Sequence, residues 1–176
     1  MLSKEKIAEA QANVRTYLAD GLLKRAKVID ANVLQVLKHN YLESLKVAEL
    51  LFSNNHSNLW TIVCSYYAMF YIANAVIYVQ GYKVGHKIAH QVTADALMVY
   101  VKDKLKDVLL VEYEETRDAA LEIAGVKAEE LVASFDAERL KRSQFQYEMT
   151  EVVKQSKAQT SLERAKAFIF EMEKLL

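Results

Sequence analysis

LWTIVCSYYAMFYIANAVIYV, residues 59–79, is the stretch that decides the fold, because it holds no charged residue in 21 positions. A run of this length is long enough to cross a membrane. It also contains four tyrosines together with Ser65 and Asn74, whose polar groups would lie inside the bilayer. We therefore favour a buried central helix of a helical bundle, which must be covered on every side. Because a small bundle rarely covers one helix fully, the stretch also predicts self-association.

The rest of the composition agrees with a helical bundle. The chain has 176 residues, the length of one domain, with four glycines and no proline. Average usage is about 5% proline, so this absence predicts long helices and excludes a turn-rich sandwich or barrel. A hydrophobic share of 52% excludes general disorder. We predict a single all-α domain over 1–176, a bundle of about five to seven helices with an up-and-down core.

Apolar residues at steps of three and four give the expected spans. We expect an N-terminal helix and five core helices, over about 3–19, 30–53, 59–80, 86–104, 127–147 and 160–175. Asp30 is the predicted cap of its helix, while 22–29 reads as irregular and basic. A further helical pattern over 108–124 is expected to stop at Gly125. Residues 148–159 form a polar joint that we expect to be extended.

Charge and cysteine content limit the partners and the compartment. Twenty-three Lys and Arg balance 23 Asp and Glu, so the whole molecule has no field that draws it to nucleic acid or to an anionic membrane, and such binding requires a local patch. Charged residues within 1–10 break the apolar run of a signal peptide. The lone Cys64 forms no internal disulfide and suits a small core position. We expect a cytoplasmic protein that has no membrane partner.

Most enzyme templates are absent from the sequence. It contains no glycine-rich phosphate loop, no CxxC, no paired Asp motif and no GxSxG. His86 and His90 are four residues apart, as two metal ligands on a helix would be, but Lys87 stands where a zinc protease has its Glu. With no third ligand, we predict no metal and no cofactor, and we interpret the two histidines as boundary residues at a helix start or a dimer seam.

A stripe near the C-terminus carries charges on an apolar face. Its members follow a spacing of three and four: Leu131, Phe135, Glu138, Arg142, Phe145 and Met149. Glu138 precedes Arg142 by four residues, the favoured ion-pair orientation, and Arg139 borders the stripe. Two interpretations stay open, a phosphate-binding arginine pair in an interface groove or an interface ion pair. The aromatic residues of 66–71 (YYAMFY) could stack nucleobases, although their place in the charge-free stretch favours the core.

Three segments resemble the HEPN family of all-helical domains. Residues 65–91 (SYYAMFYIANAVIYVQGYKVGHKIAHQ) resemble its tyrosine- and alanine-rich core helix, which is followed by a glycine turn and a helix start with histidine. Residues 139–147 (RLKRSQFQY) resemble its arginine-bearing helix, and 162–176 (LERAKAFIFEMEKLL) its closing helix. The resemblance implies a homodimer that is associated with RNA or nucleotides, often beside a nucleotidyltransferase.

Active members of the family use an Arg, a polar residue and then, four to six residues after the Arg, a His to cleave RNA without metal. Here Arg142 is followed by Ser143, Tyr147 stands where His is expected, and all four histidines lie upstream. Without an imidazole that shares a proton near neutral pH, Arg142 can hold a phosphate but the chain is not expected to be an enzyme.

The resemblance and the missing His together give a functional hypothesis. We predict a non-catalytic HEPN-like dimer that binds RNA or a nucleotide through Arg139, Arg142, Tyr147 and His86, docks a nucleotidyltransferase partner, or does both, in a module of the toxin–antitoxin type. One alternative is a metal-independent endoribonuclease toxin in which Tyr147 or His86 replaces the usual base. The other is a purely structural partner protein.

Overall fold

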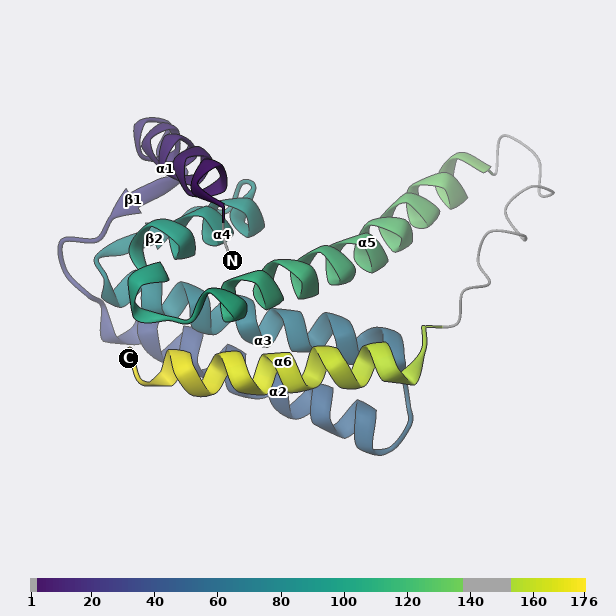
Figure 1. Ribbon diagram of the computed structural model, residues 1–176. Coiled ribbons are helices and arrows are strands. Elements are labelled where there is room, and N and C mark those ends of the chain that lie inside the picture. Colours follow the sequence, from purple (N-terminus) through teal and green to yellow (C-terminus); the bar gives the residue numbers. More distant parts are fainter. Residues whose placement is uncertain (1–2, 138–152) are drawn as a thin grey trace.

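The computed structural model describes residues 3–137 and 153–176, and over these ranges the protein is an all-α bundle with one small two-stranded sheet (Figure 1). The predicted fold class is confirmed. The elements in chain order are α1 Lys4–Ala19, β1 Leu23–Arg25, α2 Ala31–Ser53, α3 Asn58–Val79, β2 Tyr82–Val84, α4 Ala89–Tyr100, a 3-10 turn Lys102–Lys104, α5 Asp107–Ala137 and α6 Gln155–Glu173.

Helix α3, the charge-free stretch, forms the centre of the bundle. It packs against α2, α4, α5 and α6, and Figure 1 shows it between α2 and α6 on one side and α5 on the other. Tyr66, Met69, Ile72 and Ile77 are all 0% exposed. By length and apolarity α3 is the one membrane-span candidate in the described part, and 67% of its most apolar window is buried inside the bundle. Burial of this kind accounts for the absence of charge.

The flanking helices complete the core from both ends of the chain. Phe168 and Met172 of α6 are fully buried against the central helix. The ring of Phe168 lies 5.3 Å from that of Tyr113, which joins α6 to α5. Helix α5 starts on the bundle and then diverges from α6 along its length (Figure 1). Residues of both helices, among them Glu122 of α5 and Thr160 of α6, line a cleft between them.

Capping side chains set the starts of α2 and α3, and the cap at Asp30 is the one that the sequence predicts. The Asp30 side chain caps α2 by accepting a hydrogen bond of 2.8 Å from the backbone N–H of Asn32. At the start of α3, Ser57 Oγ accepts from the N–H of Trp60 at 3.2 Å. Such caps satisfy backbone donors that have no partner within the helix.

The helix predicted over 86–104 is wrong at both ends. Gly81, with φ of 89°, turns the chain after α3, and β2 then pairs antiparallel with β1, with Leu23 opposite Val84. Helix α4 starts only at Ala89, after a left-handed Ile88 that is 56% exposed, and it ends at Tyr100. Strands of three residues are too short to show a recognisable alternation of apolar and polar residues in the sequence, so this two-stranded ribbon was not predicted.

The predicted helix stop at Gly125 is also wrong, because α5 continues through it to Ala137. Glycine costs about 1 kcal/mol in a helix interior but leaves the hydrogen bonding intact. The two helices expected over 108–124 and 127–147 are thus parts of one helix, α5, up to Ala137, where the described residues of this region end. Helix α6 starts at Gln155, so the end of the expected joint over 148–159 is helical rather than extended.

Candidate anion-binding site

Three of the four site residues predicted from the sequence, Arg139, Arg142 and Tyr147, lie outside the described residues. His86 is exposed in the loop between β2 and α4, four residues before His90. No group of three or more His, Cys, Asp or Glu side chains suited to a metal ion occurs among the residues that the structure describes. The side chains that the structure does bring together come from α3, α4 and α5.

We name these side chains the Tyr66 cluster: Tyr66 of α3, His90 of α4, and Tyr113 and Arg117 of α5. The hydroxyl of Tyr66 and Nδ1 of His90 share a hydrogen bond of 2.8 Å. The rings of Tyr66 and Tyr113 are 5.9 Å apart and both side chains are fully buried. Tyr113 and Arg117 are four residues apart, so they lie on the same face of α5.

The cluster combines a neutral imidazole with a permanent cation. Burial raises the pKa of Tyr66 above its usual range, so the phenol keeps its proton. Burial, with a further contribution from the charge of Arg117, lowers the pKa of His90 below 6.5. Burial opposes the charge on Arg117, but the hydrogen bond and charge of Asp118 outweigh it and raise the pKa of the guanidinium. At neutral pH the cluster therefore carries one cation and an uncharged histidine.

The hydrogen bonding of the cluster is incomplete. Asp118 accepts from Nε of Arg117 at 2.9 Å and lies 2.8 Å from Nη2. Nη1 of Arg117 is buried and has no hydrogen-bond partner among the described residues, and the buried hydroxyl of Tyr113 has only the Tyr66 hydroxyl as a polar neighbour there, beyond normal hydrogen-bond geometry. The Arg117 side chain is only 12% exposed. Buried donors without partners are rare in folded proteins, because each costs about 1–3 kcal/mol.

Aromatic side chains of α3 border the cluster. The ring of Phe70 lies 4.7 Å from the imidazole of His90, and that of Tyr67 lies 5.9 Å from it and nearly perpendicular to it. Tyr67, Phe70 and Tyr71 are partly exposed, while Tyr66 and Met69 are fully buried. The core interpretation of 66–71 thus holds for one face of the helix only. The other face offers aromatic surface beside a histidine.

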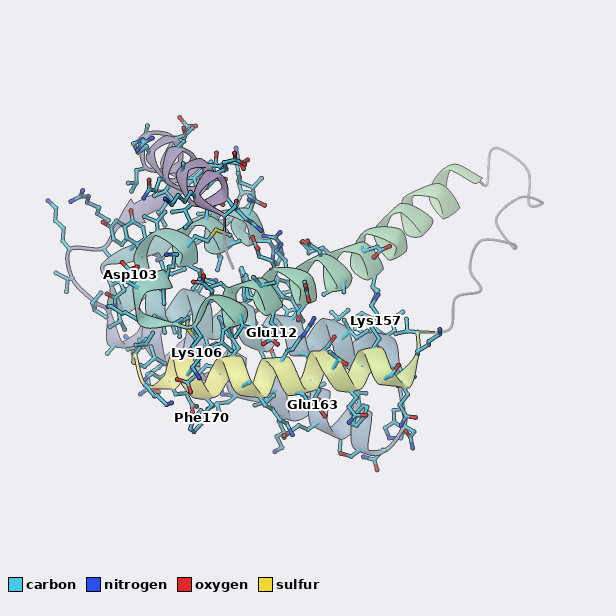
Figure 2. All side chains as sticks on the ribbon, in the orientation of Figure 1. Asp103, Lys106, Glu112, Lys157, Glu163 and Phe170 are labelled. Atoms are coloured by element: carbon cyan, nitrogen blue, oxygen red, sulfur yellow. The ribbon has the colours of Figure 1, made fainter. Side chains whose placement is uncertain are left out.

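The cleft between α5 and α6 adjoins the cluster through Asp118, which lines it. Its volume is about 970 Å³. Its α5 wall is acidic, with Glu115 and Glu122 beside Asp118, and the opposite wall is basic, with Lys157 and Arg164 of α6 and with Lys154 just before that helix. Figure 2 shows Lys157 on the side of α6 that faces α5. Arg164 and Glu115 connect the walls by an ion pair of 2.6 Å.

One residue of this site, Arg117, has a signal in the sequence that was missed. It follows Tyr113 at helical spacing on a face that also carries the buried Leu110 and Ala120. Like Arg142, it is therefore a charge within an apolar stripe, which is costly unless the charge is paired or opens onto a cleft. The pairing of Tyr66 with His90 has no such local signal, since it joins two helices.

Searches of protein-family models, curated proteins and solved structures each find no match to this chain.

Proposed function

We propose that the protein is a non-catalytic, HEPN-like RNA- or nucleotide-binding protein that holds a phosphate at the Tyr66 cluster. The observation that carries this proposal is the buried guanidinium of Arg117, with Nη1 unpartnered among the described residues. A phosphate oxygen would complete its hydrogen bonding, and arginine is the side chain best suited to phosphate. The partly exposed rings of Tyr67 and Phe70 offer a surface on which a base can stack.

The state of His90 favours binding over cleavage. Its Nδ1 is engaged by the Tyr66 hydroxyl, and burial together with the charge of Arg117 lowers the pKa of the imidazole, which disfavours the uptake of a proton. A general base must instead accept a proton from the attacking hydroxyl. We therefore favour a binding protein over the endoribonuclease alternative.

The proposal includes a homodimer. Along α3, Trp60 is 55% exposed, and Cys64, Tyr67 and Tyr71 continue from it as a partly exposed stripe at helical spacing. Pairing of two such stripes would cover this surface and bring two Tyr66 clusters toward one groove. Light scattering that reports a monomer at micromolar concentration would remove this part. Docking of a nucleotidyltransferase in a module of the toxin–antitoxin type remains the further proposal that follows from the resemblance.

A binding titration with an Arg117→Gln variant tests the proposed site. Labelled single-stranded RNA and ADP are titrated separately, and RNA cleavage is followed in the presence of a chelator. Loss of a charge-assisted contact to phosphate should weaken binding roughly tenfold to a hundredfold. We expect no cleavage by either protein.

Arg15→Gln is the matched control, because Arg15 is exposed on α1 and the substitution removes the same charge. The control should bind as the unmodified protein does. If Arg117→Gln unfolds, Arg117→Lys replaces it, keeping the charge while losing the planar fork. Equal affinity of the folded variant and the unmodified protein contradicts the site, and chelator-resistant cleavage that depends on Arg117 favours the endoribonuclease.

A further inference from the structure

The β1–β2 ribbon concentrates positive charge in a protein whose formal net charge is zero. The paired segments 22–29 and 81–88 contain Lys24, Arg25, Lys27, Lys83 and Lys87 and no Asp or Glu. None of these five forms an ion pair with a residue in the described ranges, where the ion pairs join other side chains. The pairing of the strands, rather than the overall charge, thus creates a basic surface.

The register places like charges face to face. Lys24 is directly opposite Lys83, and both side chains are exposed. Like charges at directly opposite positions destabilise a strand pair, and a ribbon of three residues per strand has little stability of its own. A bound polyanion would relieve this repulsion, so the ribbon gains more from an anionic partner than isolated lysines would.

Neighbouring groups extend the basic surface. Lys104 donates a hydrogen bond of 2.7 Å to the side chain of Gln80, next to the turn that starts β2. On the other side of the ribbon, Arg25 is opposite Tyr82, whose ring stacks on that of Tyr100 at 4.0 Å. Cations beside partly exposed aromatic rings are typical of surfaces that follow a nucleic-acid strand.

We propose that the β1–β2 ribbon docks the phosphate backbone of single-stranded RNA. The choice of RNA rests on the proposed function, whereas the basic surface is independent of the Tyr66 cluster. An anionic membrane is the competing partner, because the segments beyond the paired strands carry exposed apolar side chains, Val28, Ile29 and Ile88. The paired strands themselves favour RNA, since Leu23 is fully buried and Val84 partly so, which leaves the opposed lysines without exposed apolar neighbours on the strands to insert into lipid.

The test is the salt dependence of RNA binding by a Lys24→Gln/Lys83→Gln double variant. Loss of two phosphate contacts should lower the slope of log affinity against log salt by about 1.4, since each contact to a single strand contributes about 0.7. Binding of ADP, which does not reach the ribbon in this proposal, should be unchanged. Thermal unfolding should show no loss of stability, because the substitutions remove a repulsion.

Lys46→Gln/Lys166→Gln, on α2 and α6, is the charge-matched control and tests whether any two lysines give the same effect. An equal slope for the ribbon variant and the unmodified protein overturns this inference, while dependence of RNA binding on Arg117 in the same assay leaves the proposed function standing. An equal decrease of the salt slope in both double variants also overturns the inference, because the effect would then not be specific to the ribbon. The last measurement is binding to vesicles that contain phosphatidylserine. If the unmodified protein binds these vesicles but not RNA, and the Lys24→Gln/Lys83→Gln variant does not bind the vesicles, the ribbon is a membrane-binding surface and the RNA proposal is wrong.

Discussion

Helix α4 carries two polar clusters that differ in one respect. Near its start, His90 belongs to the Tyr66 cluster, in which Nη1 of Arg117 is unpartnered among the described residues. Five residues later, Asp95 is 5% exposed, and its Oδ2 accepts hydrogen bonds from the Tyr17 hydroxyl at 2.8 Å, from Asn13 at 3.2 Å and from Gln91 at 3.3 Å.

Burial and charge therefore do not by themselves indicate function. Both clusters are buried and both contain an ionisable group, but the Asp95 cluster uses its donors within the protein. Two of those donors, Asn13 and Tyr17, belong to α1, so the cluster fastens α1 to α4. In the Tyr66 cluster, Nη1 of Arg117 has no hydrogen-bond partner among the described residues, so it is a donor that a ligand could use.

The largest expected effect is the loss of stability in Asp95→Ala. The substitution leaves three donors without their acceptor, two of them on α1, and should lower the free energy of unfolding by about 3 kcal/mol. Urea unfolding measures the change. RNA and ADP binding by the folded fraction should be unaltered, because Asp95 has no place in the proposed site.

Asp103→Ala is the control, since that side chain is 97% exposed and its loss should change stability by less than about 0.5 kcal/mol. If Asp95→Ala is as stable as the control, the Asp95 cluster does not fasten α1. If Asp95→Ala remains folded but no longer binds RNA or ADP, the Asp95 cluster contributes to the binding site and the proposed difference between the two clusters is wrong.

A matched pair of tyrosine substitutions tests the difference between the clusters more sharply. Tyr17→Phe removes a hydroxyl that donates to Asp95 and should destabilise the fold by about 1.5 kcal/mol. Tyr113→Phe removes a buried hydroxyl whose one polar neighbour among the described residues is the Tyr66 hydroxyl, beyond normal hydrogen-bond geometry. It should change stability by less than about 0.5 kcal/mol, because the loss of a weak contact is offset by the removal of a desolvated donor. Only the urea midpoint of Tyr17→Phe should therefore fall. A comparable loss of stability in Tyr113→Phe would mean that its hydroxyl is satisfied.

The sequence predicted the periodic parts of this structure. The absence of charge in α3, the cap at Asp30 and the spacing of α6 are local patterns, so they indicated helices and a core. The errors fall where tertiary contacts decide: the β1–β2 pairing joins segments about sixty residues apart, with Gly85 so close to the carbonyl oxygen of Leu22 that a Cβ would lie 2.9 Å from it. Continuity of α5 through Gly125 likewise contradicts a local rule.

The candidate site was predicted less well than the fold. The histidine and tyrosine of the Tyr66 cluster are far apart in sequence, and their contact depends on how α4 packs on α3. The four-residue spacing of His86 and His90 suggests a metal pair and gives no indication that His90 contacts a tyrosine. Arg117 lies within a charged run, EYEETRD, and although its spacing places it on an apolar stripe, only the packing shows that its guanidinium is buried.

The smallest expected effect is on the titration of His90, and it tests whether Arg117 and His90 act on each other. NMR titration should give His90 a pKa below 6.5, chiefly because the ring is partly buried and secondly because of the charge of Arg117. In Arg117→Gln the pKa should rise but remain below 6.5, since burial persists, and it should be unchanged in Arg15→Gln. The sign for stability follows from the lowered folded-state pKa. Neutral His90 contributes stability above pH 6.5 that is lost as the pH falls through its folded-state pKa, and this acid-side loss should be smaller in Arg117→Gln. An identical pKa in both variants would place the guanidinium charge away from the imidazole and remove the electrostatic basis of the shared phosphate site.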